Sequence, residues 1–222
     1  MVKQRTISRV NRSKDEARNF YDHISGCYDW LGGLFEREPA IRVLDYLKIQ
    51  SNEIALEIGF GTGFCLKRIA ASVGHNGKAY GLDISGGMVK KTKERLNKAS
   101  LSSRVELYQG DAANLPFVDK TFDAVFISFT LELFDIPEIP KVLGEVARVL
   151  KPEGRLGIAS LYRGNSLAVR AYEWIHTKWP KYIDCRPIYL TSVLQQSEFK
   201  IIFRDTMRLV ILPVEIVIAR KN

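Results

Sequence analysis

Short apolar runs alternate along most of the chain with segments whose apolar residues recur every three or four positions. The apolar runs predict strands at about 54–58, 79–83, 104–109, 122–129 and 154–160. The segments between them predict helices at about 63–72, 86–99 and 137–150. This alternation is typical of β-α units arranged around a parallel sheet. We therefore expect an α/β fold with helices on both faces of a mostly parallel sheet.

Two further helices are expected before the first strand. Ser13 and Glu16 have the spacing of a capping box, and apolar residues then recur at helical intervals from Ala17 to Leu31. The pair Gly32-Gly33 is expected to end this helix. A second helix is predicted over about 39–47.

The tail departs from the β-α rhythm. Helices near 166–177 and 191–197 are followed by strands near 200–205 and 212–219. A parallel crossover needs a dozen or more residues, so two strands this close cannot both be parallel. The pattern predicts an antiparallel strand at one edge of the sheet.

The whole chain, 1–222, is expected to form a single domain. We divide it into an N-terminal helical cap or lid (1–50), a cofactor-binding core (51–160), and helices with the final two strands (161–222).

Composition and charge narrow the class of protein. Hydrophobic residues make up 46% and charged residues 26% of the chain, as in a globular protein. The longest apolar stretch, Leu209–Ala219, is too short to span a bilayer and contains Glu215. No apolar segment follows the basic N-terminus, and the cysteines lack metal-ligand spacing. We expect a cytoplasmic protein without a metal site.

The glycine-rich stretch Ala55-Leu-Glu-Ile-Gly-Phe-Gly-Thr-Gly-Phe64 is the most informative part of the chain. Glycines between a buried strand and a helix let a ligand approach the backbone and the free N–H groups of the helix N-terminus. A dinucleotide-binding loop would need glycine at position 64, where this chain has Phe64. The pattern is instead E-x-G-x-G-x-G, with Glu57 ahead of the first glycine.

Two more acids follow later strands. Asp83 closes the second strand, where a carboxylate can accept hydrogen bonds from a ribose diol. Asp111 follows the third strand. Open α/β sheets bind ligands at the carboxyl ends of their strands, so the three acids are expected to face one site.

Together these motifs resemble those of the class I S-adenosylmethionine-dependent methyltransferases. The resemblance rests on the glycine loop, Tyr80-Gly-Leu-Asp-Ile84, Gly110-Asp-Ala112 and Arg148-Val-Leu-Lys-Pro-Glu-Gly154. It covers roughly residues 20–160. It implies a Rossmann-like seven-stranded sheet in the order 3-2-1-4-5-7-6, with strand 7 antiparallel. It also implies S-adenosylmethionine as cofactor, S-adenosylhomocysteine as product, and no metal.

The resemblance implies the following cofactor-contacting residues: Glu57, Gly59, Gly61, Gly63, Asp83, Ile84, Met88, Asp111, Ala112 and Phe129. The glycines would face the methionine part, Asp83 the ribose hydroxyls and Asp111 the adenine amino group. Glu57 would hold the loop and, through water, the methionine ammonium. Ile84 and Met88 would pack on the adenine, and Phe129 would lie beside the methionine tail.

The acceptor side is less defined. The segment 20–29 resembles that of the ubiquinone/menaquinone-biosynthesis methyltransferases and of the bacterial phosphatidylethanolamine N-methyltransferases. That resemblance would place Tyr28 and Tyr21 near the transferred methyl. The quinone group typically carries glutamate where this chain has Ala159. His176 is expected at the surface, and no general base is assigned.

Several acceptors therefore stay open. A small, hydrophobic or lipid-like acceptor, of quinone or phospholipid type, is the preferred one. The basic segments 1–18 and 88–100, each net +4, keep an RNA or other nucleic acid open, and a protein acceptor is the third alternative. The fourth alternative is a catalytically silent module that only binds S-adenosylmethionine. The basic N-terminus could also contact an anionic membrane. Apolar residues around Gly32-Gly33 (Trp30, Leu31, Leu34 and Phe35) are interpreted as a movable lid. The sequence does not indicate an oligomeric state.

Overall fold

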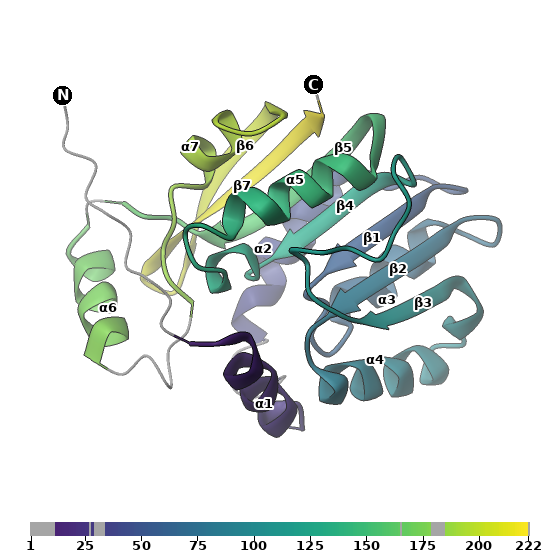
Figure 1. The fold of residues 1–222 in the computed structure, drawn as a ribbon, viewed down its shortest axis with the longest axis horizontal. Helices are drawn as coiled ribbons and strands as arrows, with labels where there is room; N and C mark the ends of the chain where they lie inside the picture. Colours follow the sequence, from purple (N-terminus) through teal and green to yellow (C-terminus); the bar gives the residue numbers. More distant parts are fainter. Residues whose placement is uncertain (1–11, 27, 29–33, 165, 179–184, 222) are drawn as a thin grey trace.

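A seven-stranded sheet crosses the molecule and brings the ends of its central strands to one edge (Figure 1). The structure is a computed structural model, and it describes residues 12–26, 28, 34–164, 166–178 and 185–221.

The strands are β1 (Ile54–Ile58), β2 (Lys78–Asp83), β3 (Val105–Gln109), β4 (Phe122–Ser128), β5 (Leu150–Leu161), β6 (Phe199–Leu209) and β7 (Leu212–Lys221). The helices are α1 (Lys14–Ile24), α2 (Leu34–Leu47), α3 (Phe64–Ser72), α4 (Gly86–Lys98), α5 (Ile139–Val149), α6 (Leu167–Lys178) and α7 (Leu190–Gln195). Two short 3₁₀ helices, η2 (Ser102–Arg104) and η3 (Leu131–Leu133), complete the described elements.

The strand order β3-β2-β1-β4-β5-β7-β6 confirms the topology that the resemblance implied. The strands from β3 to β5 pair in parallel, whereas β7 is antiparallel to both of its neighbours. The expectation of an antiparallel strand at the edge was wrong, because β7 inserts between β5 and β6. The edge strand β6 runs parallel to β5.

Each face of the sheet carries its own apolar core, as expected for a buried parallel sheet. Alternate residues of β1 and β4 point to opposite faces: Leu56 and Val125 pack with the α5 layer, and Ala55 and Ala124 with the α2 and α3 layer. Figure 1 shows α5 and α7 over one face and α2 and α3 behind the other.

The N-terminal helices differ in length from the prediction. The capping box is confirmed, since the Ser13 side chain accepts from the Glu16 N–H and the Glu16 side chain accepts from the Ser13 N–H. However, α1 ends at Ile24 rather than at the Gly32-Gly33 pair. The helix α2 begins at Leu34, before Pro39. Apolar periodicity alone did not reveal that the first helix ends at Ile24.

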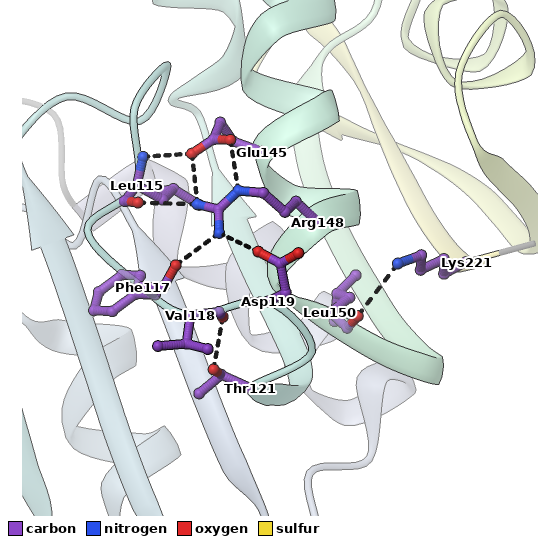
Figure 2. Close-up of polar contacts among 9 residues, drawn as sticks. All are labelled: Leu115, Phe117, Val118, Asp119, Thr121, Glu145, Arg148, Leu150 and Lys221. Carbon is purple, nitrogen blue, oxygen red and sulfur yellow. Dashed lines mark hydrogen bonds and ion pairs between the residues drawn. The ribbon is translucent and has the colours of Figure 1, made fainter.

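The motif Arg148–Gly154 has a structural role. The Arg148 guanidinium donates to Glu145, Asp119 and the carbonyl oxygens of Leu115 and Phe117, while the Leu115 N–H donates to Glu145 (Figure 2). These bonds fix the long connection from β3 to β4, which begins with Gly110-Asp-Ala112.

The predicted turn at Lys151–Gly154 lies inside β5 instead. It forms an irregularity where the pairing with β4 shifts register, and Glu153 has φ +63°.

None of the described helices has the length and apolarity needed to cross a membrane.

Candidate functional site

The glycine loop between β1 and α3 lines a cavity of about 350 Å³. Its three glycines have φ of +72°, +52° and +78°, in the left-handed region that favours glycine. A Cβ atom on Gly59 would lie 2.2 Å from Thr130 Oγ1, and one on Gly63 2.5 Å from Thr92 Cγ2. On Gly61, the nearest described atom would be Tyr28 Cε1, at 3.9 Å. Gly59 and Gly63 therefore permit close packing of the protein, whereas Gly61 faces the open cavity.

Asp83 lies beneath this loop, at the end of β2. Its Oδ2 accepts a 2.9 Å hydrogen bond from the Gly61 N–H, and its Oδ1 accepts one of 2.9 Å from the Ser85 N–H. Burial raises the pKa of the carboxyl to about 6, against these hydrogen bonds, which lower it. The side chain thus orients the loop and still lines the cavity with oxygen lone pairs.

Glu57 is the second buried acid of the cavity wall. Burial, and then the nearby Asp83, raise the pKa of its carboxyl well above the usual range. Among the described residues, Oε2 of Glu57 has no hydrogen-bond partner. A buried polar atom without a partner costs free energy, and a cationic or hydrogen-bonding ligand in the cavity would remove that cost.

Asp111 follows β3 and is already engaged by the protein. Its Oδ1 accepts from the Ala113 N–H at 3.0 Å, and its Oδ2 lies 2.6 Å from the Lys14 ammonium. Lys14 also pairs with Glu138 at 2.7 Å. A ligand amino group at Asp111 would share this carboxylate with Lys14.

The remaining predicted residues border the same space. Ile84, Met88, Ala112 and Phe129 all line the cavity, and the last three are buried. The structure therefore brings together every predicted cofactor residue except Gly63, which packs against Thr92 at the base of the loop.

The helix α1 covers one side of the cavity and is held there by polar contacts. None of its residues is fully buried. Besides the Lys14 ion pairs, Asp22 accepts from the Ser85 hydroxyl at 2.5 Å and from the Gly87 N–H at 2.8 Å. These contacts join α1 to the start of α4.

The tyrosines expected on the acceptor side also line the cavity. The rings of Tyr21 and Tyr28 lie 6.3 Å apart, and the Tyr28 hydroxyl donates to Glu36 at 3.2 Å. Of the proposed lid, Trp30, Leu31 and the glycine pair lie outside the described residues, as does the side chain of Leu34. The side chain of Phe35 is exposed.

The expectation that His176 lies at the surface was wrong. Its side chain is only 5% exposed and lines the cavity, from the inner face of α6. The spacing could have shown this, because Val169, Tyr172 and His176 recur at helical intervals on the face that turns inward. By contrast, His23 and His75 are exposed.

Glu132 and Arg186 form a second polar group that the sequence did not reveal. Both are buried; Glu132 accepts from the Leu161 N–H at 3.1 Å, and Arg186 donates to the Phe134 carbonyl. Burial raises the pKa of Glu132 to about 7, although Arg186 opposes the shift. These hydrogen bonds connect the segment after β4 to the end of β5 and to the segment after α6. Leu133 and Phe134, in the segment after β4, line the cavity.

In the described part of the chain, no cluster of three or more His, Cys, Asp or Glu residues could hold a metal ion.

Comparison with known proteins supports one family for this arrangement. A family described as a methyltransferase domain matches residues 55–154, which include the glycine loop, Asp83 and Asp111. The demethylmenaquinone methyltransferase of Bacillus mycoides is 34% identical over 152 residues, covering 66% of this chain and 63% of that protein. Residues 55–154 thus match a methyltransferase domain, as the resemblance to the class I S-adenosylmethionine-dependent methyltransferases predicts.

Other relatives have similar names. The demethylmenaquinone methyltransferase of Lactobacillus johnsonii is 38% identical over 112 residues, covering 50% of this chain and 45% of that protein. The 2-phytyl-1,4-naphtoquinone methyltransferase of Nostoc punctiforme is 29% identical over 166 residues, covering 73% of this chain and 71% of that protein. The matches to the Bacillus and Lactobacillus proteins span less than two thirds of those relatives.

Solved structures confirm the fold of this chain. An Aquifex aeolicus SAM-dependent methyltransferase has a TM-score of 0.70 and 23% identity, over 90% of this chain and 98% of that one. The 4+2 cyclase SpnF has a TM-score of 0.77 and 17% identity, over 98% of this chain and 99% of that one. Because one of these neighbours is called a cyclase, the fold alone does not assign the reaction.

Proposed function

We propose that this protein transfers a methyl group from S-adenosylmethionine to a small hydrophobic acceptor of the quinone type. The observation that carries the proposal is the Gly61 loop, which faces an open cavity and lies over the buried Asp83. It adjoins the Glu57 oxygen for which the described part of the chain offers no hydrogen-bond partner. A cofactor with an ammonium group and a ribose diol fits these groups, because both are hydrogen-bond donors.

The cofactor would be held mainly by the residues predicted from sequence. The Asp83 carboxylate would accept from the ribose hydroxyls, and Glu57 would face the methionine ammonium. Met88 and Ile84 would pack on the adenine, with Asp111 near its amino group. Bound there, S-adenosylmethionine supplies an activated methyl group, and the protein has to position the acceptor in line with it.

The rest of the cavity fits a flat apolar acceptor better than a polymer. Aromatic side chains from separate elements line it: Tyr21, Tyr28, Phe64, Phe129 and Phe134. The whole cavity, cofactor part included, has a volume of about 350 Å³, at the lower end of the range for small-molecule sites. These features, with the names of the quinone relatives, favour the quinone-type acceptor over an RNA or a protein.

His176 would act on the acceptor as a general base. Methyl transfer to a neutral acceptor releases one proton overall, and a neutral imidazole can take it up. We assign this role to His176 because it is the only histidine among the described residues that line the cavity.

Transfer of labelled methyl to defined acceptors tests the proposed function. We expect label from S-adenosylmethionine to enter a demethylated naphthoquinol, kept reduced in detergent solution. A phosphatidylethanolamine and a transfer RNA serve as alternative acceptors. Labelling of either of these without the quinol would refute the quinone assignment, and labelling of none would refute methyl transfer to these classes.

A charge-removing substitution at Asp83 tests the cofactor site separately. Charged hydrogen bonds contribute about 1.5–3 kcal/mol, so Asp83→Asn should weaken cofactor affinity by about tenfold or more. In the wild type, affinity should fall as the pH drops below about 6, because the carboxyl then takes up a proton and accepts less well. Calorimetric titration across pH measures both effects. An Asn variant with wild-type affinity and pH dependence would contradict the ribose role.

A further inference from the structure

The outer face of α6 exposes large apolar side chains between basic ones. Leu167 is 80% exposed and Trp174 is 59% exposed. Arg170 and Lys178 are also exposed, and the four residues follow one another at intervals of three or four positions. They therefore lie on one side of the helix. Tryptophan and leucine flanked by lysine and arginine are typical of helices that lie in a membrane interface.

The turn between β6 and β7 has the same character. Val210 and Ile211 are 72% and 69% exposed, and the neighbouring Arg208 is also exposed. Val210 has φ +57°, a conformation that glycine or asparagine adopts more easily than a β-branched residue. This turn thus combines an unfavourable backbone conformation at Val210 with exposure of two apolar side chains to water. Strained conformations of this kind are typical of functional sites.

Both elements lie next to the carboxyl end of β5, on the side of the sheet where the strand ends border the cavity. The Tyr162 N–H, just after β5, donates to the Pro213 carbonyl beside the turn at 2.8 Å. Figure 1 shows α6 on the same side of the molecule as the β6–β7 turn. The opposite face of α6 carries His176 into the cavity wall. The exposed surface and the acceptor side of the cavity are therefore two faces of one helix.

We propose that the outer face of α6 and the β6–β7 turn form a membrane-docking surface that binds anionic lipid headgroups. The inference rests on the proposed function, since a quinone with a long apolar tail resides in a bilayer. Leu167, Trp174, Val210 and Ile211 insert at the headgroup level, and Arg170, Lys178 and Arg208 contact the lipid anions. Docking there holds the acceptor side of the cavity against the bilayer that contains the acceptor.

Charge favours a membrane over a second copy of the chain. The chain has a formal net charge of +8, and the basic residues of this surface flank its apolar residues. In a symmetric dimer the same patch would face itself, and its positive charges would repel one another. An anionic bilayer complements both the apolar and the charged groups, and each basic side chain near such a surface strengthens binding about fivefold.

Vesicle sedimentation with the full chain tests the docking surface. Wild-type protein is expected to bind vesicles of phosphatidylglycerol and phosphatidylcholine in equal parts, and to bind pure phosphatidylcholine at least about fivefold more weakly. The double variant V210G/I211S suits the backbone of the turn, so it should fold at least as stably while its vesicle affinity falls about fivefold or more. Trp174→Ser should weaken binding similarly.

Val118→Ser is the matched control. Val118 is 78% exposed but lies in the connection before β4. It is therefore at the amino ends of the parallel strands, whereas the cavity is at their carboxyl ends. Unchanged vesicle binding in V210G/I211S and in Trp174→Ser, or an equal loss in Val118→Ser, would overturn the proposed surface. So would a wild-type dimer that dissociates in V210G/I211S without any vesicle binding.

A short-chain, water-soluble quinol separates this inference from the proposed function. We expect V210G/I211S to methylate that acceptor at the wild-type rate and to lose activity only on an acceptor presented in vesicles. If wild-type protein binds vesicles through this surface but methylates neither acceptor, the proposed function fails and the docking surface stands. If both acceptors are methylated equally by wild type and variant, the docking role is refuted and the proposed function stands.

Discussion

Gly61→Ala is expected to weaken binding of S-adenosylhomocysteine by roughly ten- to more than a hundredfold while the protein stays folded. A Cβ atom at this position meets no described protein atom closer than 3.9 Å, so the added methyl group occupies space that the ligand needs. The contacts displaced include hydrogen bonds to charged groups, which contribute about 1.5–3 kcal/mol each. Isothermal calorimetry measures the affinity directly.

The control for Gly61→Ala has to reproduce its backbone strain. Gly61 has φ +52°, where alanine is disfavoured, so some loss of stability is expected whatever the ligand does. Gly74→Ala places the same substitution at φ +73° in the turn after α3, at the other end of that helix from the cavity loop, where the added Cβ would lie 2.7 Å from the Ser51 hydroxyl oxygen. Comparable destabilisation of both variants, with affinity lost only in Gly61→Ala, supports the cavity role. Equal affinity in the two variants would place the cofactor elsewhere.

His176→Asn is expected to lower kcat by about 10²–10⁴, the usual contribution of a general base, and to leave cofactor affinity unchanged. The loss should fall on kcat more than on KM, because the imidazole acts when the acceptor gives up its proton. Steady-state kinetics on the naphthoquinol give kcat and KM, and calorimetry gives the cofactor affinity.

His75→Asn is the matched control for His176→Asn. His75 is exposed, contacts Arg104 and does not line the cavity. The His75→Asn variant should retain wild-type kinetics. A His176 variant with normal kcat would reduce this residue to a packing role in the cavity wall.

The parts of the site that the sequence predicted are those encoded in short segments. The three glycines and Asp111 follow predicted strands and Asp83 ends one, and parallel strands necessarily end at a common edge. Strand order and the antiparallel β7 were predicted from the resemblance. The strand pattern alone placed the antiparallel strand at the edge, because it cannot show which neighbours a final hairpin chooses.

Contacts between distant segments were beyond the sequence. Lys14 and Asp111 are separated by 97 positions, and nothing in either segment indicates the other. Glu132 and Arg186 are both charged types that usually remain at the surface, so their burial contradicts the ordinary expectation. The end of α1 at Ile24 was missed because apolar residues continue at helical spacing beyond it.

The attachment of α1 by ion pairs and hydrogen bonds determines how the cavity can be reached. Exposed ion pairs generally contribute about 1 kcal/mol or less, and water replaces them readily. Because α1 has no fully buried residue and contributes the partly buried Tyr21 to one core, its departure would leave most of the two apolar cores in place. We therefore expect an open form to be separated from the closed one by a small free energy and to be present as a minor population before any ligand arrives. Cofactor exchange can then proceed through thermal opening of one helix, without partial unfolding of the domain.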